Sequence, residues 1–199
     1  MKIGVLALQG AVAEHVRLLQ QAGADAVAVK RPHELEDLDG LVIPGGESTT
    51  ISKLMHKYDL FVPILEMYKQ QKPLFGTCAG LILLAARIEG HEQAHLGLLN
   101  ISVERNAFGR QRESFEMDLE VTGIAEEFPA VFIRAPIITG IDDTVTPLSQ
   151  VGDRIVAVRE GFVLGASFHP ELTDDNRIHT YFLKMVKEAM TIRMSSSLT

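Results

Sequence analysis

The stretch KPLFGTCAGLILLAAR, residues 72–87, decides the fold and contains the only cysteine of the chain, Cys78. One apolar run ends at Gly76 and another begins after Gly80, so the pattern predicts a strand, a tight turn and a helix. Gly-x-Cys-x-Gly in this setting is the cysteine form of a nucleophile elbow, a strained turn that presents its side chain above a sheet. The two glycines are expected to give neighbouring segments clearance.

The position of Cys78 predicts a nucleophile. Backbone amides at the start of the following helix, at Ala79, would stabilise a thiolate. The alternative is that Cys78 is a small buried apolar residue, the commonest environment of a free cysteine. A base elsewhere in the chain would favour the nucleophile.

The segment SFHPEL, residues 167–172, supplies such a base. His169 follows an apolar run and emerges at the end of a strand, where active sites of α/β proteins gather. In extended backbone Glu171 lies on the same side as His169, so it can hold one imidazole nitrogen while the other faces the thiol. Cys78, His169 and Glu171 are therefore predicted to form a catalytic triad.

The segment LVIPGGESTT, residues 41–50, predicts a strand that runs into a glycine loop and a helix. The backbone N–H groups of Gly45 and Gly46, together with that of Ala79, are predicted to form an oxyanion hole. A phosphate-binding loop is the competing interpretation. It is disfavoured because the segment lacks the Gly-Lys-Ser/Thr ending that supplies a lysine and a metal-binding hydroxyl.

The pattern of apolar runs predicts one α/β domain over residues 1–199. In the first half, short runs rich in Val, Ile and Leu alternate with segments of helical period, which is typical of a parallel sheet covered on both faces. Strands are predicted at residues 2–8, 25–30, 38–46 and 73–75, and helices at residues 11–23 and 48–70, the second capped by Ser48 or Thr49 and interrupted near Pro63.

Beyond residue 95 the strands alternate in polarity, which is typical of antiparallel pairs with one solvated face. They are predicted at residues 98–104, 114–121, 130–135, 154–160 and 162–169. A final helix over 174–190, capped by Thr173, precedes a tail expected to fray from about residue 191. The prediction is a flavodoxin-like three-layer sandwich with a mostly parallel central sheet and an added antiparallel section.

Composition excludes several classes of function. The net charge is −7 without a basic block, which disfavours a nucleic-acid partner, and no apolar stretch is long enough to span a membrane. One cysteine excludes an intramolecular disulfide, and the N-terminus lacks the pattern of a secretion signal. A cytoplasmic protein is expected.

The segment HEQAH, residues 91–95, matches the His-Glu-x-x-His signature of zinc proteases. Both histidines would need one face of a long helix, but Gly90 and Gly97 bracket them, so a surface loop without metal is predicted. The remaining histidines considered are expected to be surface or packing residues without a role: His15, His33, His56 and His179.

The motifs PGGES, GTCAG and HPE are similar, in order and approximate spacing, to those of the class I glutamine amidotransferases. Within that group, five segments resemble the glutaminase subunits of pyridoxal 5'-phosphate synthases: MKIGVLALQGAVAEH, PGGESTTI, PLFGTCAGLILLA, RNAFGRQRESFE and FIRAP. The resemblance extends from residue 1 to about residue 190.

The resemblance implies that the Cys78 thiolate attacks the side-chain carboxamide of L-glutamine and forms a cysteinyl thioester, which water hydrolyses. His169 would protonate the departing ammonia while Glu171 orients it, and no cofactor is implied. Substrate would be held by Gly46, Glu47, Ser48, Arg105, Ile133 and Arg134. Either arginine could instead form a surface ion pair, and which end of glutamine each one binds stays open.

The resemblance also implies a partner, a synthase subunit with a (β/α)8 barrel that takes up the ammonia and assembles pyridoxal 5'-phosphate. Gln9 and Gly10, at the end of the first strand, are predicted to sense this partner. Two other functions stay open: an elbow-cysteine peptidase or chaperone-like α/β protein, and a non-catalytic regulatory subunit with a vestigial triad. Ammonia release from glutamine, with and without the partner, distinguishes them.

Overall fold

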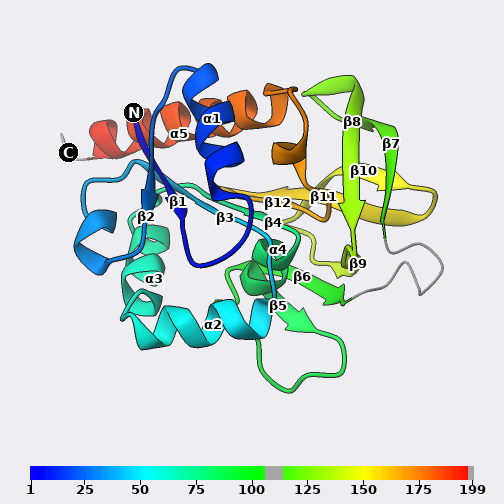
Figure 1. The fold of residues 1–199 in the computed structure, drawn as a ribbon, viewed down its shortest axis with the longest axis horizontal. Coiled ribbons are helices and arrows are strands. Elements are labelled where there is room, and N and C mark those ends of the chain that lie inside the picture. The colour runs from blue at the N-terminus through cyan, green and yellow to red at the C-terminus, as the bar shows by residue number, and fades with distance from the viewer. Residues whose placement is uncertain (106–113, 197–199) are drawn as a thin grey trace.

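The structure, a computed structural model, describes residues 1–105 and 114–196 (Figure 1). The strands of these ranges are β1 (Lys2–Leu6), β2 (Asp25–Val29), β3 (Gly40–Ile43), β4 (Leu74–Thr77), β5 (Ala85–Ile88), β6 (Leu99–Glu104), β7 (Ser114–Val121), β8 (Ala125–Ile133), β9 (Ile137–Ile141), β10 (Thr146–Val151), β11 (Arg154–Glu160) and β12 (Val163–Ala166). The helices are α1 (Val12–Gln21), α2 (Ser48–Lys57), α3 (Phe61–Lys69), α4 (Ala79–Leu84) and α5 (Arg177–Ser196), with 3-10 turns η1 (Pro32–Leu35) and η2 (Pro170–Leu172).

The central sheet has the strand order β2, β1, β3, β4, β12, β11, β9, β6 and β5, with β10 paired to β11. The first five strands in this order are parallel. Helices α1 and α5 cover one face of this parallel part, and α2 and α3 cover the other (Figure 1). The predicted three-layer sandwich with a mostly parallel central sheet is therefore confirmed.

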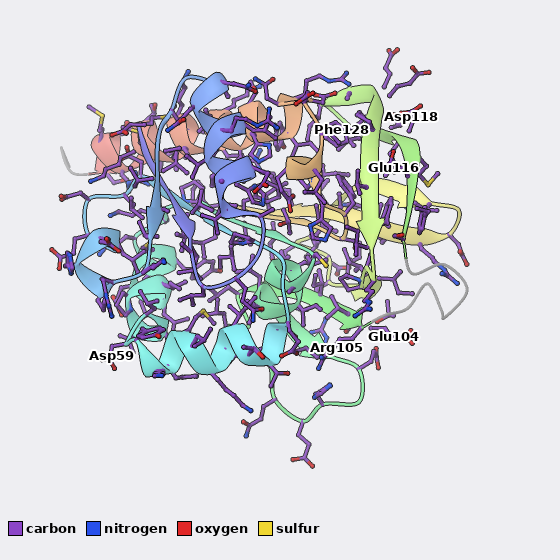
Figure 2. The ribbon with its side chains drawn as sticks, viewed as in Figure 1. Asp59, Glu104, Arg105, Glu116, Asp118 and Phe128 are labelled. Atoms are coloured by element: carbon purple, nitrogen blue, oxygen red, sulfur yellow. The ribbon has the colours of Figure 1, made fainter. Side chains whose placement is uncertain are left out.

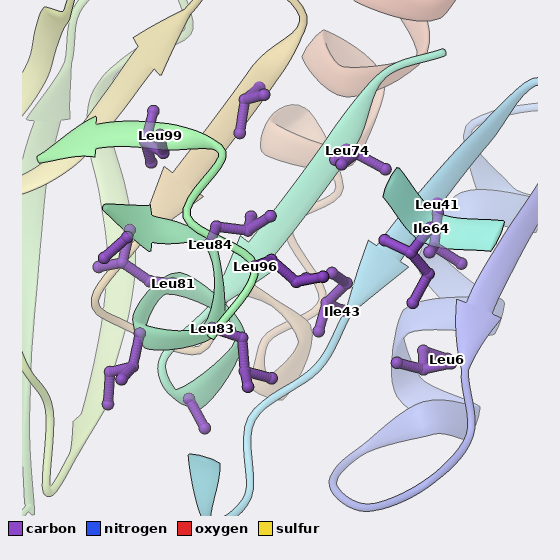
Figure 3. Close-up of a cluster of buried hydrophobic side chains, with 14 of the residues drawn as sticks. Leu6, Leu41, Ile43, Ile64, Leu74, Leu81, Leu83, Leu84, Leu96 and Leu99 are labelled. Carbon is purple, nitrogen blue, oxygen red and sulfur yellow. The ribbon is translucent and has the colours of Figure 1, made fainter. Parts of the chain in front are cut away.

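Alternation along the inner strands divides the apolar core into two layers. Leu74 of β4 packs on the side of α2 and α3, whereas its neighbour Phe75 packs on the side of α1 and α5. Both faces of β3 and β4 are buried, which explains why these strands are continuous apolar runs. Figure 3 shows part of the first layer, including Leu6, Leu41, Ile43, Leu81, Leu83, Leu84 and Leu96.

The second half of the chain extends the sheet with antiparallel pairs, as predicted. β11 pairs with β12, β10 and β9, and β6 pairs with β9, all antiparallel. β7 and β8 form a separate antiparallel sheet of two strands, at the right of Figure 1. The sequence did not predict β9 or β10.

One strand lies where a helix was predicted. The helix after Cys78 ends at Leu84, and Ala85–Ile88 form β5, which pairs in parallel with β6. The residues of β5 are good helix formers by propensity, so the pairing with β6 overrides the local preference.

The predicted caps were wrong for two helices. Residues 48–70 form α2 and α3, as the predicted interruption required, but Glu47 rather than Ser48 or Thr49 is the N-cap. Its carboxylate accepts hydrogen bonds from the N–H of Thr49 at 3.0 Å and of Thr50 at 2.7 Å. A longer acidic side chain one residue earlier reaches both donors, which the hydroxyl residues within the helix do not.

The final helix begins at Arg177 and ends at Ser196, later at both ends than predicted. Thr173 does not cap it, because its hydroxyl bonds to the N–H of Asp175 and the carbonyl oxygen of Pro170 in the preceding turn. Part of the tail that was expected to fray is thus helical, and residues 197–199 lie outside the described residues. None of the described helices is both long and apolar enough to cross a membrane.

Candidate active site

The corner between β4 and α4 has the geometry of the predicted elbow. Cys78 separates Thr77, the last residue of the strand, from Ala79, the first of the helix. Its φ is 51°, in the left-handed region that side chains rarely adopt, so the turn is strained. The Cys78 N–H donates to the carbonyl oxygen of Ala166 at 2.8 Å, which ties the corner to β12.

The two glycines of the elbow leave room for its neighbours, as expected. A Cβ atom at Gly80 would overlap the carbonyl oxygen of Ile43 in β3, and one at Gly76 would lie 2.5 Å from the backbone of Gly80. Real Cβ atoms do not approach other atoms so closely. The elbow is therefore packed directly against the adjacent strand.

The pairing of β4 with β12 brings the second half of the site to the elbow. Thr77 lies beside Ala166 in parallel register, so the chain that leaves β12 passes next to Cys78. The Nδ1 atom of His169 lies 2.7 Å from the Oε1 atom of Glu171, whose side chain is fully buried. Glu171 belongs to the 3-10 turn η2 rather than to extended backbone, so the predicted contact is made by a different local geometry.

The surroundings of His169 favour its protonated form. Burial by itself lowers the pKa of His169, but hydrogen bonds to Cys78 and Glu171, with the charges of both groups, raise it to about 10. At neutral pH the imidazole next to the sulfur therefore carries a positive charge. The Cys78 Sγ atom also lies 3.8 Å from the carbonyl oxygen of Ile133.

The glycine loop after β3 lies against both groups. A Cβ atom at Gly45 would lie 2.7 Å from His169 Cε1 and 3.4 Å from Cys78 Cβ. Gly46 has a φ of 137°. Any larger residue at Gly45 would push the imidazole away from the sulfur.

The turn after β1 supports this loop. The Gln9 side chain accepts a hydrogen bond from the N–H of Glu47 at 2.8 Å. Gly10 has a φ of 87°, and a Cβ atom there would overlap the carbonyl oxygen of Gly45. A change in the position of Gln9 and Gly10 would therefore be transmitted directly to the glycine loop.

A cavity of about 510 Å³ lies above the elbow and gathers most of the predicted site residues. Its lining consists of Gln9, Gly46, Glu47, Ser48, Cys78, Ala79, Ile82, Arg105, Ile133, Arg134 and His169. Gly45 and Glu171 lie behind this lining, and Gly10 lines a neighbouring groove. Ile82 was not predicted, although its position one helical turn after Cys78 could have identified it.

Two charged groups of the cavity, Glu47 and Arg105, are held in place by contacts within the protein. The Arg105 guanidinium lies 3.2 Å from the Glu47 carboxylate, and Figure 2 shows Arg105 beside the start of α2. The Thr50 hydroxyl and, more weakly, the N–H groups of Thr49 and Thr50 lower the pKa of Glu47 to about 2, against the opposing effect of burial. The buried Ser48 hydroxyl has no hydrogen-bond partner within residues 1–105 and 114–196. Ser48 is nevertheless part of the cavity lining.

Two other motifs remain outside the cavity. Residues 91–95 of HEQAH form a loop, as predicted, and His91 lies 3.5 Å from Arg105. Most of the RNAFGRQRESFE segment, residues 106–113, lies outside the described residues.

Two histidines that were expected to be surface or packing residues without a role lie behind Glu171. His15 and His179 are both fully buried, and His15 contacts the Glu171 carboxylate. No signal in the sequence marks them, because each is an isolated histidine on an amphipathic helix.

Comparison with known proteins agrees with this geometry. The SNO glutamine amidotransferase family matches residues 5–188. The chain belongs to this family. It is therefore a glutamine amidotransferase, an enzyme that hydrolyses glutamine, and the predicted family is confirmed.

Among its relatives, the chain is similar to the pyridoxal 5'-phosphate synthase subunits PdxT of two bacteria. The Brevibacillus brevis protein is 62% identical over 188 residues, which cover 94% of this chain and 98% of the relative. The Geobacillus kaustophilus protein is 60% identical over 198 residues and the whole of both chains.

Solved structures confirm the fold. A crystal structure of a glutamine amidotransferase superposes with a TM-score of 0.88 at 50% identity, covering 93% of this chain and 98% of that one. PurLQS from Thermotoga maritima has a TM-score of 0.65 at 19% identity, covering 95% and 98%, which shows a shared fold alone.

Proposed function

We propose that the chain is the glutaminase subunit of a pyridoxal 5'-phosphate synthase. It hydrolyses L-glutamine to glutamate and ammonia, and the ammonia passes to a synthase subunit with a (β/α)8 barrel. The names and end-to-end similarity of the PdxT relatives support the pathway. The observation that carries the chemistry is that Cys78 and His169 line one cavity and that Glu171, behind its lining, lies 2.7 Å from His169.

In the first step the Cys78 sulfur attacks the carboxamide carbon of glutamine. A C–S bond forms, and the electrons of the C=O double bond move to its oxygen. The N–H groups of Gly45, Gly46 and Ala79 stabilise this oxyanion, and the charged imidazolium of His169 stabilises the thiolate before the attack.

In the second step the C–N bond breaks. His169 gives its proton to the departing nitrogen, which leaves as ammonia, and Glu171 holds the other imidazole nitrogen so that the ring stays in place. Water then attacks the cysteinyl thioester, with neutral His169 accepting its proton. Glutamate leaves, and the thiolate and imidazolium are restored. No metal or cofactor takes part in these steps.

Substrate binding falls to the polar lining of the cavity. Arginine binds carboxylates with two parallel hydrogen bonds, so Arg105 and Arg134 are the candidates for the α-carboxylate of glutamine. Ser48, whose hydroxyl has no hydrogen-bond partner in the described part of the chain, lines the cavity together with Gly46, Glu47 and Ile133, which supports a ligand there. A reactive single cysteine also supports a reducing location, the cytoplasm.

The ammonia assay tests this proposal. Glutamate and ammonia release would be measured with the full chain alone and with the synthase subunit, and peptide and aldehyde substrates would be offered in parallel. Glutamine turnover is the expected result. Turnover of peptides or aldehydes alone would favour the peptidase or chaperone-like alternative, and no turnover under any condition would favour a regulatory subunit.

The pKa of His169 predicts the alkaline limit of this activity. The imidazolium must be present to protonate ammonia, so kcat/KM for glutamine should decline as pH rises through about 10. A group with a raised pKa also stabilises the fold below the ordinary value of 6.5, and this contribution is lost as pH rises through about 10. A decline in kcat/KM near pH 7 instead would show that His169 does not form the ion pair with Cys78 and Glu171.

The hydrogen bond between Gln9 and the glycine loop after β3 predicts that Gln9 takes part in activation by the synthase subunit. Gln9→Ala removes the acceptor for the Glu47 N–H, so stimulation of turnover by the synthase subunit should fall several-fold. Gln70→Ala, an exposed change at the end of α3, is the matched control and should leave stimulation intact. Equal stimulation of both variants would refute the role.

A further inference from the structure

The Glu171 carboxylate has two buried sides. Its Oε1 atom faces His169, whereas its Oε2 atom lies 3.4 Å from the Nε2 atom of His15 in α1. Oε2 has no hydrogen-bond partner among residues 1–105 and 114–196, so the contact with His15 is electrostatic. Both side chains are fully buried, so no water screens the contact. The same His15 nitrogen lies 3.3 Å from the hydroxyl of Thr77, the residue before the elbow cysteine.

A second histidine from α5 continues the chain of contacts. The Nε2 atom of His179 lies 2.8 Å from the Nδ1 atom of His15, and its own Nδ1 has no hydrogen-bond partner in the described part of the structure. Phe75 packs edge-on against both rings, at centroid distances of 6.4 and 6.1 Å. Burial lowers the pKa of His15 well below its usual value and that of His179 to about 3, so both rings are neutral.

Two neutral rings at this distance share one proton, and two arrangements are possible. If His15 donates from Nδ1, its Nε2 lone pair faces the negative Glu171, and His179 buries an N–H without an acceptor. If His179 donates from Nε2, the proton of His15 is on its own Nε2, where it bonds to the Thr77 hydroxyl and lies beside the Glu171 carboxylate. The unpaired atom is then an acceptor, and a buried orphan acceptor is tolerated more often than a buried orphan N–H.

We propose that His15 is a positioning residue for Glu171, held by His179 in the tautomer whose Nε2–H bonds to the Thr77 hydroxyl and places its positive end beside the second carboxylate oxygen. The active site then has five members rather than three: His179, His15, Glu171, His169 and Cys78. The positive end of this N–H beside Oε2 favours the orientation in which Oε1 faces His169, because a buried carboxylate oxygen without a nearby donor is costly. This inference rests on the proposed glutaminase function.

The other charged groups near the contacts of His179, His15 and Glu171 lie at the protein surface. Arg17 of α1 adds to the lowering of the pKa of His179, but its guanidinium bonds to Asp174 at 3.0 Å and to the carbonyl oxygen of Thr173. Its side chain is 42% exposed. Direct contact with the Glu171 carboxylate is thus left to His15 and His169 among the titratable groups of the described residues.

The test compares variants of the full chain assayed with the synthase subunit. His15→Phe replaces the imidazole with an apolar ring that has no donor, and kcat should fall about 10- to 100-fold, the loss found when residues that orient metal-binding histidines are removed, with KM little changed. The alkaline limb of the pH profile should move below its wild-type position near 10, since Glu171 is no longer held in its hydrogen bond to His169. His15→Gln, which can place an N–H near the same point, should restore the limb and most of kcat.

Phe75→Leu is the control for packing, since it loosens both rings without touching a donor. It should lower the melting temperature and leave the pH limb unchanged. If the wild type hydrolyses glutamine and the His15→Phe variant keeps the same kcat and the same alkaline limb, the inference is overturned. The proposed function is then left intact. No turnover by the wild type would instead refute the proposed function.

A direct measurement covers the case in which His15→Phe fails to fold. Nitrogen-15 NMR of the wild-type chain, labelled at histidine, distinguishes the two tautomers without an activity assay. The expected spectrum places the His15 proton on Nε2 and the His179 proton on Nε2. A proton on Nδ1 of His15 would overturn the inference.

Discussion

Replacing Cys78 with alanine is expected to abolish glutamine hydrolysis, with a loss of at least about 10,000-fold in kcat. Without sulfur no C–S bond forms, and no other thiol exists in the chain to replace it. The residue is 7% exposed and alanine is close to it in size, so the fold should persist. Ammonia and glutamate release, measured with the synthase subunit present, provides the test.

The control for this variant is Ser52→Ala, an equally small change at a buried position of α2 that does not line the cavity. It should retain most of the turnover. Circular dichroism and thermal unfolding would show whether both variants are folded. Substantial ammonia release by a folded Cys78→Ala variant would contradict covalent catalysis by this thiol, and with it the proposed mechanism.

Replacing Gly80 with alanine should destabilise the protein by about 3 kcal/mol or more, at the upper end of the usual cost of overpacking a core. The new methyl group would overlap the carbonyl oxygen of Ile43, which is backbone and cannot rotate away. Relief requires α4 to move off β3, and this would displace Cys78 and Ala79 from the cavity. Activity should therefore be lost together with stability. Urea unfolding and the ammonia assay measure the two effects.

Gly140→Ala in β9 is the matched control. A Cβ atom there would lie 3.7 Å from the nearest atoms, those of Ser102, which is ordinary van der Waals contact. Its effect on the free energy of unfolding should stay below about 1 kcal/mol. Equal stability of the two variants would mean that the elbow is less tightly packed than the structure describes.

The residues of the site differ in how far sequence alone could place them. The elbow was predictable because Gly76, Cys78 and Gly80 are neighbours in the chain and the turn depends on them directly. The contact of His169 with Glu171 was also predictable, since only Pro170 separates them. Their meeting with Cys78 required the parallel pairing of β4 with β12, which the alternation of strands and helices favoured but did not specify.

The errors occurred where several local choices were close in energy. Glu47 competes with Ser48 and Thr49 for the same backbone donors at the start of α2, and the longest side chain reaches two of them. Residues 85–88 suit a helix, and the unpaired edge of β6 makes them a strand. Propensity alone distinguishes neither case, because the differences are smaller than the energies of the contacts that decide them.

The order of residues along the chain was sufficient for the α/β class, the elbow and the choice of Cys78, His169 and Glu171 as the candidate triad. These features depend on contacts within a few residues and on side-chain types. The surroundings of Glu171 depended on three-dimensional packing, since its second oxygen meets His15, which in turn meets His179, 164 residues further on. Burial and contacts between distant segments are properties of the assembled core, so a histidine that nothing in the sequence distinguishes lies directly behind Glu171.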